Sequence, residues 1–295
     1  MNAPAPAKAQ LQAFAKDIKL SHTIFALPFA LAAAWIVHRA TPVGLMSWFW
    51  ILVAMVGARS SAMGFNRIVD RRIDAANPRT DGRQLASGAL DLRWAVGLTL
   101  GSAALLVLAA WMLSPEAFLA SPFVLMVLWG YSLTKRFTAL CHIWLGFALG
   151  LSPACVWLAL TGTITATPVV MGVAILAWVG GFDTLYALQD REYDQEVGLN
   201  SIPARLGEVG ALRVSGALHG VAVAALLALP LTTPLGWPYF VAVAVVAGIL
   251  AWEQSLVKPG DLSKMNAAFF QANAWVSVVM AVGIVVATLV TPLSI

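Results

Sequence analysis

Charged residues are scarce in this chain, and their scarcity excludes a water-soluble globular protein. Asp, Glu, Lys and Arg make up only 11% of the 295 residues, whereas 60% of the residues are hydrophobic. The mean hydropathy of +0.82 lies far above that of a soluble domain of similar length. The composition therefore predicts an integral membrane protein.

Cysteine is almost absent as well, which excludes a disulfide framework. Cys141 and Cys155 fall in the same apolar run, about 21 Å apart along a helix, so they cannot bridge each other. The sequence also lacks zinc-type Cys/His spacing, a Walker loop, a Gly-rich dinucleotide fingerprint and a Ser-centred nucleophile elbow. These absences remove the commonest nucleotide-binding and hydrolase classes.

What the chain has instead is long apolar runs, each able to cross a bilayer as a helix of about 20 residues. Nine such runs cover residues 20–38, 46–66, 92–113, 118–134, 138–160, 167–189, 208–230, 236–257 and 265–290. We therefore predict an all-α, multi-pass transmembrane bundle of nine helices in a single domain, residues 1–295. Residues 1–16 are predicted to be a polar N-terminal tail, because they lack the apolar core and cleavage site of a signal peptide.

Basic residues occur in alternate segments between the runs, as the positive-inside rule requires. Of the 18 Lys and Arg residues, all but Arg39 and Arg59 precede the first span or follow the second, fourth, sixth or eighth span. This pattern places the N-terminus and the two longest loops, about 67–91 and 190–207, in the cytoplasm and the C-terminus outside. The net charge of +4 then reflects membrane orientation and anionic ligands, and we expect no nucleic-acid partner.

Two acidic clusters stand at the cytoplasmic ends of the second and sixth predicted spans. Each contains two aspartates four residues apart, Asp70 with Asp74 and Asp190 with Asp194. On a helix such residues lie one turn apart on the same face, where their oxygens suit Mg²⁺ bound together with a phosphate. The two pairs occupy matching positions of a weak parallel repeat, which predicts that both face one central cavity.

Two further ionisable residues lie deeper in the same spans. Arg59 shares a helical face with Asn66, and Asp183 precedes Tyr186 on the stripe that leads to Asp190. An ionisable side chain at such depth in a membrane is functional by default. We predict that Arg59 holds the carboxylate of an acceptor substrate. The alternative is an ion pair between helices, for example with Asp183.

Basic side chains accompany the acidic clusters in a pattern that suits a diphosphate. Arg79 and Arg83 follow the first cluster, and Lys135 follows Tyr131 by one helical turn. Guanidinium forks and an ammonium group bind phosphate oxygens, while Mg²⁺ bridges those oxygens to aspartate. These three residues are therefore predicted to bind the diphosphate.

Taken together, the motifs resemble the signature of the UbiA superfamily of intramembrane aromatic prenyltransferases. They are Asn66-Arg67-x-x-Asp70-x-x-x-Asp74, Arg79-Thr-x-x-Arg83, Tyr131-x-x-x-Lys135 and Asp183-x-x-x-Ala187-x-x-Asp190-x-x-x-Asp194. The segments 18–30, 134–138 and 261–270 are similar to a bacterial branch resembling 4-hydroxybenzoate polyprenyltransferases. Gln84 and Ala86 stand where the family often has prolines, which puts the stiffness of this loop in doubt and leaves the metal site untouched.

The resemblance implies a nine-helix bundle that opens laterally to membrane lipid and binds Mg²⁺ through Asn66 and the four paired aspartates. It also implies a bacterial inner-membrane enzyme that transfers a polyprenyl group from polyprenyl diphosphate to an aromatic hydroxy acid. We expect 4-hydroxybenzoate as the acceptor, in ubiquinone biosynthesis. In this scheme Tyr131 or Tyr186 faces the allylic cation and Asp183 or a neighbouring carboxylate accepts the ring proton.

Two other functions stay open at this stage. The same reaction on a dihydroxynaphthoate would serve menaquinone biosynthesis, and a deep Arg59 suits either acid. A membrane transporter would also carry an internal repeat and intramembrane charges, although it has little use for two metal-binding aspartate pairs on one face.

Overall fold

The computed structural model describes residues 6–18, 27–265 and 271–291. Within these ranges the chain is helical and contains no β-strand. It divides into two compact units. Unit 1 comprises Met1–Thr23 and Phe49–Leu133, and unit 2 comprises Ile24–Trp48 and Thr134–Ile295. The predicted all-α membrane fold is confirmed.

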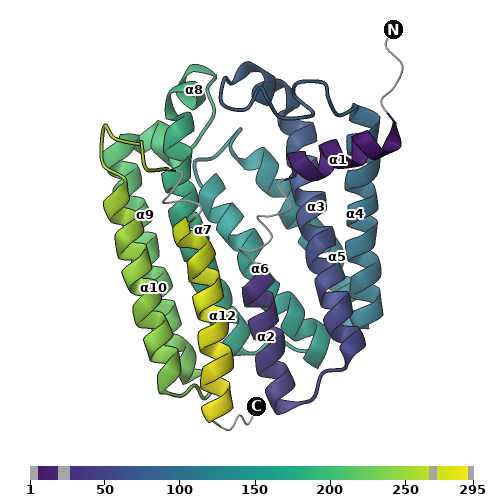
Figure 1. The fold of residues 1–295 in the computed structure, drawn as a ribbon, viewed down its shortest axis with the longest axis vertical. Helices are drawn as coiled ribbons and strands as arrows, with labels where there is room; N and C mark the ends of the chain where they lie inside the picture. The colour runs from purple at the N-terminus through teal and green to yellow at the C-terminus, as the bar shows by residue number, and fades with distance from the viewer. Residues whose placement is uncertain (1–5, 19–26, 266–270, 292–295) are drawn as a thin grey trace. The chain divides into compact units, whose positions relative to one another are not determined.

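Unit 1 contains a short N-terminal helix and three long helices (Figure 1). These are α1 (Ala7–Asp17), α3 (Leu45–Ala76), α4 (Leu92–Leu113) and α5 (Pro115–Thr134). The α1 helix occupies most of the segment that we predicted to be a polar tail. Its buried Phe14 belongs to a cluster with Ile18, Leu85 and Leu90, so this apolar face holds α1 against the rest of unit 1.

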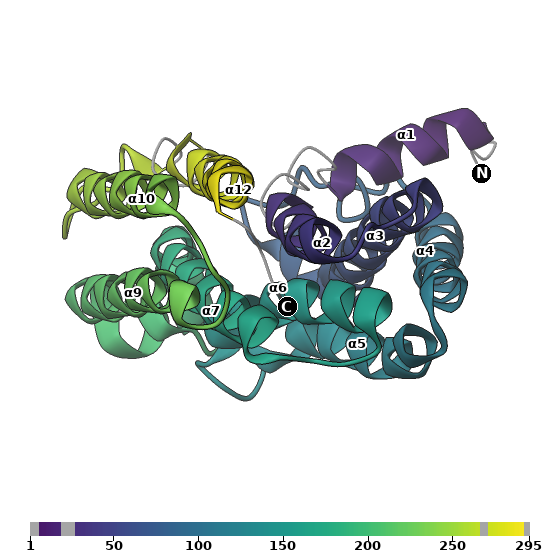
Figure 2. The same cartoon turned by 90° about the horizontal axis from the view of Figure 1, so that it is seen from below.

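Six longer helices of unit 2 form a closed ring. In chain order they are α2 (Leu27–Ala40), α6 (Cys141–Thr161), α7 (Ala166–Tyr186), α9 (Ile202–Ala228), α10 (Trp237–Leu256) and α12 (Asn273–Val290). Each contacts the next, and α12 returns to α2, an order that can be followed end-on in Figure 2. The 3₁₀ helices η2 (Ala187–Asp190) and η3 (Leu229–Leu231) and the short helix α8 (Arg191–Glu196) connect them.

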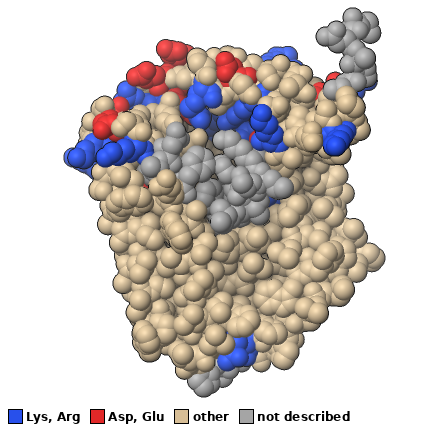
Figure 3. Space-filling model, viewed as in Figure 1, with Lys and Arg blue, Asp and Glu red and all other residues tan. Residues whose placement is uncertain are grey.

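Eight helices of the described residues are long and apolar enough to cross a membrane, and α2 is a shorter apolar helix. The predicted count of nine spans is therefore not confirmed. The first predicted span, 20–38, is seen only from Leu27 onward, since residues 20–26 lie outside the described ranges. In Figure 3 the Lys, Arg, Asp and Glu side chains gather near helix ends, and residues of other types cover the helix lengths.

Both long loops expected after the acidic clusters are shorter than predicted. The α3 helix continues to Ala76, and its 32 residues extend about 48 Å, well beyond a hydrocarbon core of about 30 Å. The first cluster thus lies on a helix, and only residues 77–91, here called the post-α3 loop, are non-helical. In the second predicted loop, α8 covers Arg191–Glu196 and α9 begins at Ile202.

Small residues set the closest helix packing in unit 2. A Cβ atom on Gly150 of α6 would lie 2.6 Å from the carbonyl oxygen of Gly172 on α7. One turn earlier in α6, a Cβ on Gly146 would overlap the carbonyl of Leu176. Without side chains at these positions the two backbones approach closely, as small residues allow in membrane helices. This contact fixes the register between α6 and α7.

Candidate active site

The first aspartate motif, defined here as Asn66, Asp70 and Asp74, lies on one face of α3. Asp70 and Asp74 are almost fully buried, with residue exposures of 1% and 4%. Asn66 donates from Nδ2 to Asp70 Oδ2 at 2.9 Å, and its Oδ1 accepts from Arg67 Nη1 at 2.7 Å. The motif is therefore ordered by hydrogen bonds within unit 1.

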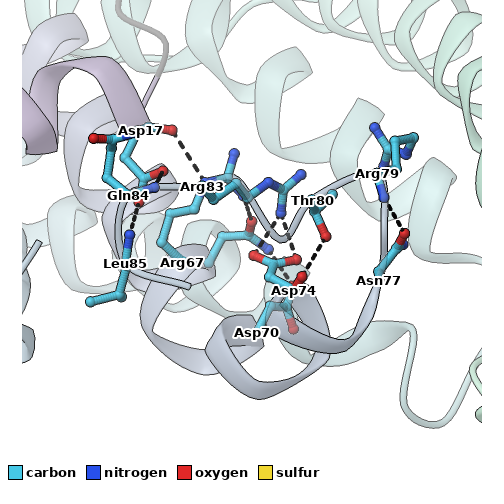
Figure 4. A network of polar contacts seen from close by, with 11 residues as sticks. Asp17, Arg67, Asp70, Asp74, Asn77, Arg79, Thr80, Arg83, Gln84 and Leu85 are labelled. Carbon is cyan, nitrogen blue, oxygen red and sulfur yellow. Dashed lines mark hydrogen bonds and ion pairs between the residues drawn. The ribbon is translucent and has the colours of Figure 1, made fainter. Parts of the chain in front are cut away.

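Asp74 is held by the post-α3 loop (Figure 4). Arg83 Nη1 lies 2.7 Å from both carboxylate oxygens of Asp74, and Thr80 donates to the Asp74 carbonyl at 3.0 Å. The post-α3 loop thus places the Arg83 guanidinium beside Asp74, near the end of α3. Arg79 is exposed, and its backbone N–H donates to Asn77 Oδ1 at 2.9 Å. The structure thus brings Arg83, rather than Arg79, onto the aspartate motif.

Asp17 and Arg67 were missed as site residues, yet they connect three parts of unit 1. The Asp17 carboxylate accepts backbone N–H groups of Gln84 at 2.9 Å and Leu85 at 3.2 Å. The buried Arg67 donates from Nε to the Asp17 carbonyl at 3.2 Å. The end of α1, the post-α3 loop and the aspartate motif therefore form one polar network. Asp17 directly follows residues 1–16, which we had interpreted as a tail, so its partners were not evident.

The other predicted residues of unit 1 lie on the long helices. Arg59 is half-buried on α3, two turns before Asn66, and interacts electrostatically with Arg67. Tyr131 of α5 is half-buried and also interacts with Arg67. Arg67 therefore lies within electrostatic range of both the acceptor-binding candidate and the tyrosine.

The second aspartate motif, Asp190 and Asp194, differs from the predicted pair on one helix. Asp190 ends the 3₁₀ helix η2, and Asp194 lies in α8. A 3₁₀ helix has about three residues per turn, so the stripe from Asp183 through Tyr186 does not continue with α-helical period. The two aspartates therefore do not lie on one regular α-helix, although Asp190 interacts electrostatically with Asp194, and their common face stays a prediction.

Lys135 is joined to this second motif by the chain that follows α8. The N–H of Leu199 bonds the Asp194 carbonyl at 2.8 Å, and the N–H of Asn200 bonds the Lys135 carbonyl at 2.7 Å. Gly198 has φ 71°, a left-handed conformation that suits glycine at the end of a helix. The Asp194 carboxylate accepts a hydrogen bond from Ser201 and interacts electrostatically with Asp190, Lys135 and His142. Unit 2 thus places a cation and a hydroxyl near Asp194.

Asp183 forms a pair that the sequence analysis did not identify. Its Oδ2 lies 2.7 Å from Nδ1 of His142, which belongs to the first turn of α6. The His142 side chain is 5% exposed and that of Asp183 18%. His142 is thus an observed partner of Asp183. Tyr186 packs on a hydrophobic cluster that includes Leu185 and Ile202.

The donor atoms of the motifs fit a hard divalent cation. Within the described ranges, no group of three or more His, Cys, Asp or Glu side chains forms a ready metal site. Each aspartate pair nevertheless supplies carboxylate oxygens, which suit Mg²⁺ when water and phosphate complete its coordination. Asn66 fits less well, because its only side-chain oxygen already accepts from Arg67. The four aspartates are candidate ligands as well, and both oxygens of Asp74 would have to exchange Arg83 for the cation.

The sequence is similar to a known protein family and to characterised relatives. The profile of the UbiA prenyltransferase family matches residues 26–277. The mitochondrial 4-hydroxybenzoate polyprenyltransferase of Caenorhabditis elegans is 32% identical over 265 residues, covering 86% of this chain and 72% of that protein. The 4-hydroxybenzoate octaprenyltransferase of Vibrio parahaemolyticus is 29% identical and covers 83% of this chain and 86% of its own.

Solved structures share the fold as well. A UbiA homologue from Aeropyrum pernix in its apo form superposes with a TM-score of 0.81 at 34% identity, covering 90% of this chain and 98% of that one. A UbiA homologue from Archaeoglobus fulgidus, bound to DMAPP and Mg²⁺, gives a TM-score of 0.66 at 18% identity, with 91% and 99% covered. At that identity the second likeness concerns the fold alone.

Proposed function

The chain belongs to the UbiA prenyltransferase family, and we propose that it transfers a polyprenyl group from polyprenyl diphosphate to 4-hydroxybenzoate in ubiquinone biosynthesis. The relatives that act on 4-hydroxybenzoate by name support this acceptor. Diphosphate binding is supported by the buried first motif, where Arg83 lies 2.7 Å from the Asp74 carboxylate. Buried carboxylates with an adjacent guanidinium suit a magnesium diphosphate, because each phosphate oxygen can meet either cation.

In this proposal each residue of the two motifs has a stated task. Asp70, Asp74, Asp190 and Asp194 would hold Mg²⁺, which when bound neutralises the diphosphate and makes it a better leaving group. Arg83 and Lys135 bind phosphate oxygens, so Arg83 exchanges the Asp74 carboxylate for substrate. Arg79, which is exposed in the post-α3 loop, is proposed to bind the diphosphate as well.

The acceptor end is assigned to side chains deeper in the helices. Arg59, half-buried on α3, is proposed to bind the substrate carboxylate by a charge-assisted hydrogen bond. Tyr131 or Tyr186 offers a ring face to the developing allylic cation. The apolar surroundings exclude water, which would otherwise convert that cation to an alcohol.

We also propose the cellular setting. Both motifs and the N-terminus face the cytoplasm from the inner membrane of a bacterium, as the distribution of Lys and Arg favours. The single domain over residues 1–295 stays a prediction. A dihydroxynaphthoate is the second candidate acceptor, because Arg59 would bind its carboxylate equally well.

The test offers the purified protein two acceptors in detergent with geranyl diphosphate and Mg²⁺. One tube contains 4-hydroxybenzoate and the other 1,4-dihydroxy-6-naphthoate, and mass spectrometry identifies any geranylated acid. We expect product with 4-hydroxybenzoate, and none after chelation of Mg²⁺. Product with the naphthoate alone would contradict the acceptor assignment, and no product with either acid would contradict the proposed reaction.

A further inference from the structure

A buried histidine beside Asp183 has an unused ring nitrogen. His142 Nδ1 lies 2.7 Å from Asp183 Oδ2, whereas His142 Nε2 is buried and has no hydrogen-bond partner among the described residues. A buried polar atom without a partner is costly. Such an atom is expected where a ligand supplies the missing hydrogen bond.

The contact between His142 and Asp183 determines the hydrogen-bonding role of Nε2. An ionised Asp183 accepts from the protonated Nδ1, which leaves Nε2 of a neutral imidazole as a hydrogen-bond acceptor. His142 lies in the first turn of α6, and Asp183 therefore stands at a helix N-terminus, where the helix dipole favours a negative charge. Through this contact the carboxylate orients the ring, as the acidic member of a catalytic triad does.

The pair is one of several contacts between its two helices. Gly146 and Gly150 of α6 already let the backbone of α7 approach closely, and this packing is apolar. A second buried histidine in unit 2, His219, likewise has a buried Nε2 without a hydrogen-bond partner among the described residues, but its Nδ1 hydrogen-bonds Gln254 instead of a carboxylate. The carboxylate partner therefore distinguishes His142 from a histidine that merely fills space.

The pair also lies near the proposed diphosphate end of unit 2. Asp194 interacts electrostatically with both His142 and Lys135. During the reaction, a carbon of the acceptor ring must meet the allylic carbon of the diphosphate substrate. A base near the diphosphate site would therefore lie close to the acceptor. An aromatic hydroxyl group is the proton donor that fits it.

We propose that His142 is a catalytic base that accepts the hydroxyl proton of the aromatic acceptor, and that Asp183 is its positioning residue. The inference rests on the proposed function. It also revises the sequence-based role of Asp183 from proton acceptor to orienting partner.

The proposed step balances as follows. Nε2 takes the hydroxyl proton, and the ring carbon ortho to the resulting oxyanion forms a C–C bond with the allylic carbon. The allylic C–O bond breaks, and diphosphate leaves with the bonding electrons. The substituted ring carbon then loses its proton to diphosphate, and Nε2 returns its own proton to the ring oxygen, which restores the aromatic phenol.

The experiment compares two acceptors that differ in hydroxyl acidity, 4-hydroxybenzoate and 3-fluoro-4-hydroxybenzoate. At an assay pH between their two hydroxyl pKa values, the fluorinated acid is already a phenolate and does not need the base. His142→Gln should lower kcat for 4-hydroxybenzoate by about 100-fold, but by about tenfold or less for the fluorinated acid. Asp183→Asn should show a smaller loss with the same dependence on the acceptor.

His219→Gln is the matched control and should keep kcat within about threefold for both acids. Thermal unfolding of each variant in detergent verifies that it is folded. An equal loss with both acceptors, or no loss, in folded His142→Gln would overturn the inference. Should His142→Gln not fold, the same comparison for Asp183→Asn decides. A wild-type protein that geranylates neither acid would instead refute the proposed function, so the two failures are distinguishable.

Discussion

Arg83 illustrates at the residue scale how one side chain serves two states of the site. Without substrate it neutralises Asp74 at 2.7 Å, and in the proposed complex it binds phosphate. Arg83→Gln should therefore raise KM for geranyl diphosphate about tenfold, which corresponds to about 1.4 kcal/mol. The control is Arg93→Gln, because Arg93 is exposed at the start of α4. Equal KM values for the two variants would remove Arg83 from the diphosphate site.

Arg67 has a structural role that can be separated from catalysis. It is buried and donates to the Asp17 carbonyl and to Asn66 Oδ1. Arg67→Met leaves these buried acceptors without a donor, at a cost of about 1–3 kcal/mol, so the thermal midpoint should fall by several degrees. Arg72→Met, an exposed position on the same helix, should leave the midpoint nearly unchanged. A stable Arg67→Met protein would show that the network does not hold α1.

At the scale of elements, the register between α6 and α7 depends on glycine. Gly150→Ala places a Cβ 2.6 Å from the Gly172 carbonyl oxygen, so the helices must separate and the His142–Asp183 pair with them. The same change at Gly248 of α10 meets open space and should stabilise the helix slightly. Thermal unfolding in detergent compares the two, and a midpoint for Gly150→Ala at or above that of Gly248→Ala would be inconsistent with this packing.

Sequence patterns foresaw the elements better than their ends. Apolar runs located the long helices because the hydrocarbon core demands about 20 apolar residues. The polar end of α3, from Arg67 to Ala76, looked like a loop because a helix that leaves the membrane loses its apolar signal. Likewise, the residue composition of Ala187–Asp190 does not predict the 3₁₀ helix that forms there.

The sequence predicted those parts of the candidate site whose residues lie close together in the chain. The first motif lies within two turns of α3, and spacing alone put Asp70 and Asp74 on one face. His142 stands alone in an apolar run, and its partner Asp183 follows only in the next helix. No local pattern reports such a contact, since it arises from the packing of α6 against α7. Asp17 and its partners in the post-α3 loop were missed for the same reason.

At the scale of the whole molecule, orientation in the membrane is the proposal most open to test. Single cysteines are introduced at exposed positions after Cys141 and Cys155 are replaced by serine. Asp81→Cys in the post-α3 loop should resist a membrane-impermeant maleimide on intact cells, whereas Thr163→Cys between α6 and α7 should react. Lysed cells are the control, in which both sites should react. The reverse labelling pattern would show that the protein has the opposite orientation in the membrane.

The central claim is that the two aspartate motifs perform prenyl transfer, and its most direct measurement is turnover of matched carboxylate variants. Asp70→Asn and Asp190→Asn keep the side-chain volume but remove the charge that is proposed to hold Mg²⁺. With geranyl diphosphate, 4-hydroxybenzoate and Mg²⁺ in detergent, each should lose more than about 100-fold in turnover while remaining folded. Asp81→Asn, at an exposed loop position, should retain wild-type turnover. Near-normal turnover in either motif variant would contradict the account.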